Sequence, residues 1–301
     1  MNNALIFYYN IYVDSINKIN ENYYFLYQSN NYIITPYNRD INEVSFIYSL
    51  NLEMIEKSVC SYRIIPTKDG RIIFIDNNIY YILMMLPNIN NRTITYEDIL
   101  KFKYIPIDNK IITALDKSNW PLYWEKKIDY FEYQFLQLEN KYPIIKESIN
   151  YYIGMWENAI SYYNDNVVFD GVKEVCHKRV GVDTDILEFY NPLNLIIDYK
   201  ERDISEYLKS FVLNENFTII KLNEMLNKLN LDRNRIVLLI SRTLFPSYYF
   251  DMYEEIVIDQ KEESKLYKTI DKRTNQKTLL KVMFDMYKDY NIPFISWIIK
   301  D

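Results

Sequence analysis

The chain has 301 residues, of which 49% are hydrophobic and 25% charged, and its formal net charge at pH 7 is −6. This length holds one large domain or two lobes, and this hydrophobic content excludes an intrinsically disordered chain. The acidic balance, without a long basic run, argues against nucleic acid or an anionic membrane surface as the main partner.

The apolar runs, such as residues 79–86, are far shorter than the roughly 20 residues of a transmembrane helix, so we expect no membrane span. The first residues lack a basic region and a cleavage site, so we expect no signal peptide. Cys60 and Cys176 lack metal-ligand spacing and are expected to be reduced thiols in a cytosol. The four glycines are isolated, which excludes a glycine-rich phosphate loop.

The first 86 residues predict a small lobe that contains a mixed β-sheet. Hydrophobic periodicity and turn residues indicate a helix at 4–17, strands at 23–27 and 32–35 around a turn at 29–31, a helix at 42–57, and strands at 59–65, 71–75 and 79–86. The last three strands are separated by turn sequences at 68–70 and 76–78. Two strands, a helix and three strands follow one another in the order of the small lobe of a kinase.

The rest of the chain, residues 87–301, predicts a larger and mainly helical lobe. The polar segment Pro87–Asn91 fits a hinge between the lobes. Helical patterns occupy residues 122–140, 143–163, 203–213, 218–229, 232–258 and 276–290. The fold class is therefore expected to be α+β with two lobes, divided into residues 1–86 and 87–301.

Residues 172–210 hold the candidate chemistry. A loop around His177, the single histidine of the chain, is followed by the strand-like run 195–197, which ends on Asp198. Asp203 and Glu206 then have the spacing of a capping box, which predicts that Asp203 opens a helix and that Glu206 reaches back to it. An acid at the end of a buried strand can hold a metal-bound phosphate, and it can also simply end the strand.

Three segments, Cys176–Arg179, Asp198–Leu208 and Leu244–Phe250, resemble motifs of the CotS/YutH group of spore coat proteins, the YutH type most of all. This group belongs to the aminoglycoside-phosphotransferase-like branch of the kinase-like folds. The resemblance implies the two-lobed kinase-like fold. It also implies synthesis in the cytoplasm, a final location in the spore coat, and other spore coat proteins as partners.

Measured against that resemblance, most of the kinase chemistry is missing. A kinase needs a strand lysine for the phosphates, an aspartate base, and an asparagine and a second aspartate for the metal ions. No lysine occurs between positions 18 and 57, Arg179 stands at the position of the base, and Thr184 stands at the position of the asparagine. Arginine cannot accept a proton at neutral pH. Only Asp198 matches, as a metal ligand if Mg-nucleotide binds.

The leading hypothesis is therefore a pseudokinase, without catalysis or cofactor, that serves as a structural or interaction component of the spore coat. The alternative is an active ATP-dependent small-molecule phosphotransferase that uses Mg-ATP, Asp198 and a relocated base, for which Asp183 and Asp185 are candidates. A third hypothesis is a sensor that binds ATP without hydrolysing it. The sequence identifies no residues that would bind a cofactor.

The side chains of the degenerate loop also have expected structural roles. His177 is expected to be a core histidine that hydrogen-bonds to neighbouring backbone. Asp203 is expected to cap its helix and to tie the loop backbone. Arg179 is expected to pair with an acid across the cleft, with Asp198 as the first candidate, because an unpaired buried carboxylate is costly. The aromatic residues around Trp120 are expected to be mostly core.

Overall fold

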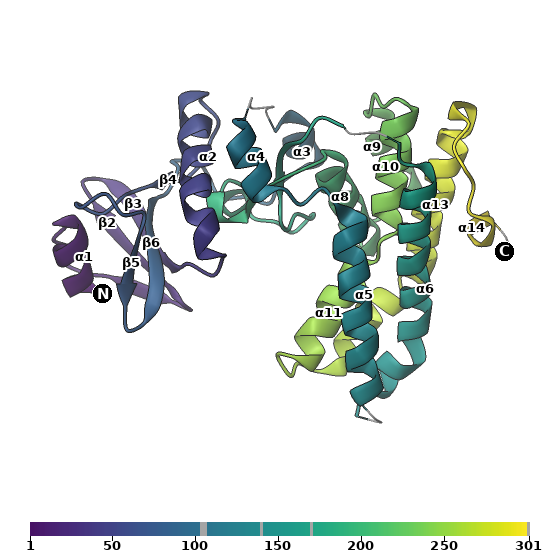
Figure 1. The fold of residues 1–301 in the computed structure, drawn as a ribbon, viewed down its shortest axis with the longest axis horizontal. Helices are drawn as coiled ribbons and strands as arrows, with labels where there is room; N and C mark the ends of the chain where they lie inside the picture. The colour runs from purple at the N-terminus through teal and green to yellow at the C-terminus, as the bar shows by residue number, and fades with distance from the viewer. Residues whose placement is uncertain (103–106, 139–140, 169–170, 300–301) are drawn as a thin grey trace.

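The computed structural model describes residues 1–102, 107–138, 141–168 and 171–299. A small sheet with one helix on its outer side lies at one end of the long axis, and a larger group of helices forms the other end (Figure 1). Within the described ranges, no helix has both the length and the hydropathy needed to cross a bilayer. The α+β class predicted from the sequence is confirmed.

The small sheet is antiparallel in all its strand pairings. Its strands are β1 (Asn17–Ile19), β2 (Asn22–Tyr27), β3 (Asn30–Pro36), β4 (Arg63–Ile64), β5 (Ile73–Asp76) and β6 (Ile79–Met85). They lie in the order β1-β2-β3-β6-β4, and β5 also pairs with β6. The prediction of a mixed sheet was wrong. Two-residue turns at 28–29 and 77–78, with positive φ at all four residues, fold β2 onto β3 and β5 onto β6.

Two predicted elements of this lobe are shorter than expected. The first helix, α1, covers Asn2–Tyr9 and not 4–17, because Asn10 adopts a left-handed conformation (φ 58°) that ends it. Residues 17–19 form β1. The strand predicted at 59–65 is reduced to β4, whereas the helix predicted at 42–57 is confirmed as α2 (Val44–Glu56) after a 3₁₀ turn at Ile41–Glu43.

The two faces of the sheet belong to two different cores. Ile34 and Leu83 pack with the residues of α1, whereas Ile33 and Ile82 belong to a larger core that continues through α2 into the helical part. Neighbouring strand residues point to opposite faces, so this division follows directly from the alternation along β3 and β6. One face of the sheet is therefore fixed to the rest of the molecule by apolar packing.

Arg39 adds polar contacts across the same junction. Its Nη1 donates hydrogen bonds to the carbonyl oxygens of Leu193 (3.1 Å) and Leu195 (2.6 Å), which lie on the helical side. Its Nη2 forms an ion pair with Glu43 at 2.6 Å, just before α2. Arg39 therefore holds the start of α2 against the hairpin described below.

The larger part contains a two-stranded hairpin surrounded by helices. The hairpin consists of β7 (Glu174–His177) and β8 (Leu195–Asp198). The helices are α3 (Tyr96–Lys101), α4 (Asn109–Leu115), α5 (Trp120–Gln137), α6 (Pro143–Asn166), α7 (Ile186–Phe189), α8 (Glu201–Leu213), α9 (Ile219–Asn227), α10 (Arg233–Leu244), α11 (Ser247–Val257), α12 (Tyr267–Ile270), α13 (Arg273–Met286) and α14 (Ser296–Ile299), with 3₁₀ turns at Pro192–Asn194, Glu263–Leu266 and Lys288–Tyr290.

The helix predicted at 232–258 is two helices. The chain turns at Phe245 and Pro246 between α10 and α11, because proline lacks the amide that would continue the helical hydrogen bonds. The other predicted helices are present with small shifts at their ends, and residues 139–140 of the helix predicted at 122–140 lie outside the described residues. Figure 1 shows α5 beside α6, with α11 packed near the end of this pair. The division at residues 86 and 87 remains a prediction.

Candidate functional site

The hairpin β7–β8 brings two of the predicted site residues, His177 and Asp198, close to the same helix. His177 lies opposite Leu195, and Glu174 lies opposite Asp198. All four residues of β8 are buried, so Asp198 ends this strand inside the protein. The helix α8 follows within three residues and returns past both strands of the hairpin, which places its first turn against His177 and Asp198.

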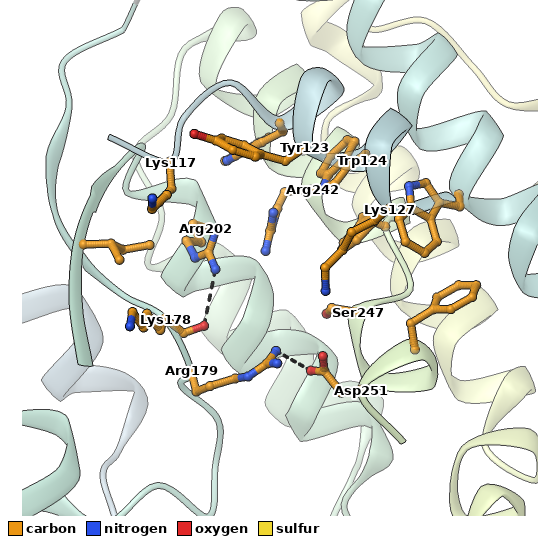
Figure 2. Close-up of a pocket in the computed structure, with 15 residues that line it drawn as sticks. Lys117, Tyr123, Trp124, Lys127, Lys178, Arg179, Arg202, Arg242, Ser247 and Asp251 are labelled. Atoms are coloured by element: carbon orange, nitrogen blue, oxygen red, sulfur yellow. Dashed lines mark hydrogen bonds and ion pairs between the residues drawn. The ribbon is translucent and has the colours of Figure 1, made fainter. Parts of the chain in front are cut away.

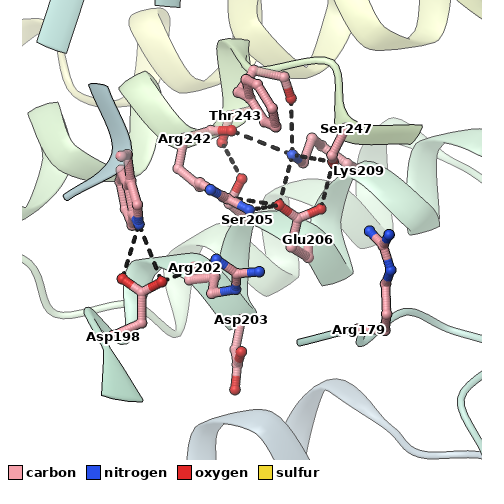
Figure 3. A network of polar contacts seen from close by, with 12 residues as sticks. Arg179, Asp198, Arg202, Asp203, Ser205, Glu206, Lys209, Arg242, Thr243 and Ser247 are labelled. Carbon is pink, nitrogen blue, oxygen red and sulfur yellow. Dashed lines mark hydrogen bonds and ion pairs between the residues drawn. The ribbon is translucent and has the colours of Figure 1, made fainter. Parts of the chain in front are cut away.

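The carboxylate of Asp198, whose side chain has no exposed area, accepts hydrogen bonds from three N–H donors of the protein itself. Trp120 Nε1 donates to both oxygens, at 2.9 and 3.1 Å. The backbone N–H of Tyr199 donates to Oδ1 at 2.7 Å, and Arg202 Nη1 donates to Oδ2 at 3.0 Å (Figure 3). Burial raises the pKa of Asp198 to about 6, and the charge of Arg202 opposes this rise. Asp198 is therefore an ionised and paired acid at neutral pH.

This arrangement does not fit a magnesium ion. Magnesium binds carboxylate oxygens together with waters in a near-octahedral shell. The N–H groups of Trp120, Tyr199 and Arg202 already bond to the carboxylate of Asp198, and a metal ion there would meet the guanidinium charge that lies 3.0 Å from Oδ2. Nor is there, among the residues that the structure describes, a group of three or more His, Cys, Asp or Glu side chains suited to a metal ion.

His177 is a buried structural residue, as predicted. Asp203 accepts hydrogen bonds from the backbone N–H of His177 (3.0 Å) and lies 2.7 Å from its Nδ1, while Nε2 lies 2.9 Å from the carbonyl oxygen of Phe189. The imidazole also stacks on the ring of Phe189 at 4.2 Å. Burial alone would raise the pKa of Asp203, but the charge and hydrogen bonds of His177 bring it below its ordinary value. The pair ties the loop to α8.

The predicted capping box was wrong. The helix α8 begins at Glu201, so Asp203 lies inside its first turn and its carboxylate points to His177. Glu206 does not reach back to the start of the helix but bonds to Lys209 and Arg242. Asp203 bonds to His177 and Glu206 bonds to Arg242, and neither acid bonds to the helix backbone as a capping box requires. A buried carboxylate is stabilised most by charged or strongly polar donors.

Glu206 is the centre of a second polar network that the sequence did not predict. It accepts from Lys209 Nζ (3.0 Å), Arg242 Nε (2.9 Å) and the hydroxyl of Ser247 (2.7 Å), which joins α8, α10 and α11 (Figure 3). Lys209 Nζ also donates to Ser247 and to the carbonyl oxygens of Arg242 and Phe245. The only local signal was the i,i+3 spacing of Glu206 and Lys209.

Arg179 pairs with an acid that lines the same cavity, as predicted, but the expected partner Asp198 was wrong. Arg179 forms an ion pair with Asp251 of α11, and its side chain is 65% exposed. Arg202 pairs with Asp198 instead, because it lies four residues later at the start of α8 and its guanidinium reaches the carboxylate from there. This i,i+4 spacing was visible in the sequence, whereas the donation from Trp120, 78 residues away, had no local signal.

The remaining candidates have local roles. Thr184 Oγ1 accepts from the backbone N–H of Gly181 at 2.8 Å. Asp185 caps α7 by accepting from the backbone N–H of Leu187 at 2.7 Å. Asp183 lines a different cavity, beside α8 and α11. Neither of these two acids lines the cavities that contain Arg179 and Arg202.

A cavity of about 280 Å³ opens beside this centre (Figure 2). Of the described residues that line it, six are cations and one, Asp251, is an acid. The cations are Lys117, Lys127, Lys178, Arg179, Arg202 and Arg242. The aromatic lining residues are Trp120, Tyr123, Trp124, Trp156, Phe245 and Phe250. The aromatic residues around Trp120 were predicted to be mostly core, but only some of them are. Trp120, Trp124 and Phe131 are buried, whereas Tyr123, Tyr130 and Tyr133 are exposed.

Replacing Arg179 with glutamine is expected to lower the free energy of unfolding by about 1 kcal/mol at most, because its ion pair with Asp251 is exposed. Urea unfolding of the variant and the unmodified protein measures this difference. The control is Arg71→Gln, which breaks the exposed pair with Asp69 and is expected to cause an equally small change. A loss above about 2 kcal/mol for Arg179→Gln alone would contradict a surface role for this pair.

Comparisons with known proteins agree with the fold and the motifs. The family described as "Spore coat putative kinase YutH" matches residues 2–283. The "Endospore coat-associated protein YutH" of Bacillus subtilis (strain 168) is 26% identical over 284 residues, which cover 85% of this chain and 83% of that protein. The resemblance found in the sequence is thereby confirmed.

Solved structures of phosphotransferases share the fold at low sequence identity. An aminoglycoside phosphotransferase from Alicyclobacillus acidocaldarius has a TM-score of 0.66 and 8% identity, and the alignment covers 96% of this chain and 97% of that one. The AMP-bound spectinomycin phosphotransferase has a TM-score of 0.62 and 12% identity, with 94% and 96% covered. The predicted aminoglycoside-phosphotransferase-like fold is thereby confirmed.

Proposed function

Because the chain belongs to the YutH family of spore coat kinase-like proteins, we propose that it is a catalytically inactive member of that family. In this proposal it works in the spore coat as a structural or interaction component, with other coat proteins as its partners and without a cofactor. The observation that carries the proposal is the carboxylate of Asp198, which Trp120, Tyr199 and Arg202 bond from inside the protein. Fold similarity alone does not establish activity.

Two further features support inactivity. Strand β3 contains no lysine, and the nearby Arg39 is bonded to Leu193, Leu195 and Glu43, so it is not free to hold a phosphate. By the resemblance to kinase motifs, Arg179 in the loop after β7 stands at the position of the base, and a guanidinium cannot accept the proton of a substrate hydroxyl.

The alternative is an active ATP-dependent small-molecule phosphotransferase. The observation in its favour is that one acid, Asp251, lines the cavity next to Arg179 and could serve as the relocated base. Activity would require Asp251 to leave Arg179, and Asp198 to leave Trp120 and Arg202, before a metal ion is bound. Breaking contacts to a buried charge is expensive, so we place this alternative second.

Millimolar Mg-ATP is expected to leave the melting temperature nearly unchanged and to yield no ATP turnover. A ligand present at 100 times its Kd would stabilise the folded state by about 2.7 kcal/mol, which thermal unfolding detects readily. The measurements are thermal unfolding with and without Mg-ATP, and the release of phosphate. The control is Asp198→Asn, which removes the one residue that matches a metal ligand.

Three outcomes of this experiment are distinct. Phosphate release that Asp198→Asn abolishes would establish the phosphotransferase and overturn the proposal. A rise in melting temperature without phosphate release would favour the nucleotide-binding sensor. An unchanged melting temperature in both proteins, with no release of phosphate, supports the proposed inactive coat component.

A further inference from the structure

Helix α5 carries large apolar side chains on its outer face as well as on its inner face. The inner face is buried and packs through Phe131 against Trp156 of α6 and Phe250 of α11. Figure 1 shows α6 on one side of α5 and α11 on the other. The large hydrophobic side chains of α5 that are nevertheless exposed are Leu122, Tyr123, Tyr130, Tyr133 and Leu136. A surface helix of a monomer usually has a polar outer face, so these residues indicate an interaction surface.

Four exposed residues of α5 lie along one line of this outer face. They are Leu122, Lys126, Asp129 and Tyr133, which are four, three and four positions apart. This is the spacing of the a and d positions through which one helix packs against another. Tyr133 follows the buried Trp124 by about two and a half turns, which places this line opposite the core. We name these four residues the α5 stripe.

Both ends of the α5 stripe are apolar and its middle is charged. Leu122 is 42% exposed and Tyr133 is 64% exposed. Within the described part of the chain, neither Lys126 nor Asp129 has an oppositely charged group at ion-pair distance. The neighbouring Lys127, in contrast, pairs with Glu254. A surface that fits the stripe must therefore offer apolar groups at its ends, with one acid and one cation between them.

An antiparallel second copy of the α5 stripe has this pattern. If two stripes run in opposite directions about a two-fold axis between residues 127 and 128, Leu122 faces the partner's Tyr133 and Lys126 faces the partner's Asp129. The symmetry repeats each contact, which gives two apolar layers and two ion pairs. A parallel arrangement would place lysine against lysine and aspartate against aspartate, which is unfavourable. The order of the four residues is therefore complementary to itself in one orientation only.

We propose that two copies of this chain form an antiparallel dimer through the α5 stripe. A contact that uses one helix of each copy is smaller than the roughly 1,200 Å² of standard interfaces, so we expect a weak dimer with a Kd of about 10–100 µM. Weak contacts of this kind add up where many copies lie close together, as in a coat. The dimer does not involve the centre around Asp198, so the inference goes beyond the proposed inactivity and does not depend on it.

Sedimentation velocity over a concentration series tests the oligomeric state. The protein is expected to be monomeric at about 1 µM and mostly dimeric near 300 µM, roughly, so unfolding experiments at about 1 µM measure the monomer. Leu122→Ser and Tyr133→Ser are each expected to weaken the dimer by at least about tenfold, because each change removes an apolar contact that the two-fold symmetry repeats.

Charge reversal tests the orientation and the partners. Lys126→Glu places two acids opposite each other and Asp129→Lys places two lysines opposite each other, so each variant alone is expected to weaken the dimer by at least about tenfold. The double variant with both changes restores opposite charges and is expected to dimerise again. An equimolar mixture of the two single variants is expected to form a heterodimer, because every acid of one variant then faces a lysine of the other.

Helix α9 supplies the matched control. Lys221 is an exposed lysine three positions before the exposed Glu224, the same arrangement as Lys126 and Asp129. Lys221→Glu is therefore expected to leave the dimer unchanged. Circular dichroism confirms that each variant is folded. All the reversed residues are exposed, and if one single variant is unfolded, the other single variant and the double variant still test the contact.

Several results would overturn the inference. A monomer at every concentration would exclude a second copy and leave the stripe to a different coat protein. A dimer that survives both single reversals, that the double variant does not restore, or that Lys221→Glu weakens equally would have another contact or a parallel orientation. None of these results affects the proposed function, which only phosphate release or nucleotide binding in the Mg-ATP experiment contradicts. The two failures are therefore distinguishable.

Discussion

Replacing Glu206 with glutamine is expected to lower the free energy of unfolding by roughly 3 kcal/mol. Only 15% of the Glu206 side chain is exposed, and its carboxylate bonds to Lys209 and Arg242, whose side chains are 3% and 6% exposed. The variant leaves these two buried cations without their common counter-ion, and an uncompensated buried charge is the most costly defect in such a network. Urea unfolding at neutral pH measures the loss.

An exposed glutamate of the same type gives the control. Glu97 pairs with Lys228, and their side chains are 44% and 48% exposed. Exposed pairs contribute between about 0 and 1 kcal/mol, so Glu97→Gln is expected to be nearly neutral. Equal losses for Glu206→Gln and Glu97→Gln would show that the buried network adds nothing to stability.

The effect of Glu206→Gln has a defined pH dependence. Burial alone would raise the pKa of Glu206. The positive charges of Lys209, Arg242 and Arg202 outweigh this effect and bring the pKa well below its ordinary value of 4.5. A lowered pKa in the folded state means that the stabilisation is complete above the unfolded pKa and is lost as the pH falls toward the folded one. The difference between the unmodified protein and the variant is therefore expected to shrink below about pH 4.5. A difference that stays constant down to pH 3, or grows there, would contradict this pH dependence.

Replacing Asp203 with alanine is expected to lower the free energy of unfolding by roughly 3 kcal/mol as well. Asp203 is fully buried and bonds to both the backbone N–H and Nδ1 of His177. Its removal leaves two buried polar groups unpaired and a small cavity between β7 and α8. Urea unfolding again measures the loss, and the control is Asp129→Ala on the exposed side of α5, expected to change stability by less than about 0.5 kcal/mol.

A double variant with Asp203→Ala and His177→Ala shows how much of the loss comes from the contact between these two residues and how much from the cavity. If Asp203 acts through His177, the losses of Asp203→Ala and His177→Ala will not add in the double variant, because each single change already breaks the same contact. Fully additive losses would show that the two residues stabilise the fold independently. In that case the pair would not be what ties the loop after β7 to α8.

The buried charges beside the cavity are paired within the protein. The charge of Asp198 is balanced by Arg202, and Trp120 donates to both of its oxygens. With Arg179 and Lys178 on the loop after β7, the neighbouring cavity presents cations. The pairing of Asp198 with Arg202 needs no metal ion, which supports the proposed loss of catalysis.

The sequence by itself determined the architecture and the role of His177. Local patterns indicated the hairpins, α2 and most of the later helices, since periodicity and turn residues act within a few positions. The β-rich runs at 32–35 and 79–86 predicted the strands β3 and β6, and the motif around His177 predicted a core histidine. The length of α1 was overestimated because a single left-handed residue, Asn10, ends this helix.

The partners of the buried charges were decided only by the tertiary structure. Asp198 bonds to Trp120 across 78 positions, Arg179 pairs with Asp251 across 72, and Glu206 with Arg242 across 36. No local pattern links such residues, because their meeting depends on how α5, α10 and α11 pack around the hairpin. Once packed, each buried carboxylate binds the strongest donors within reach, and burial makes that choice worth several kcal/mol. The partners of these buried carboxylates, and not the sequence motif around His177 and Asp198, therefore decide which groups remain free to bind a ligand.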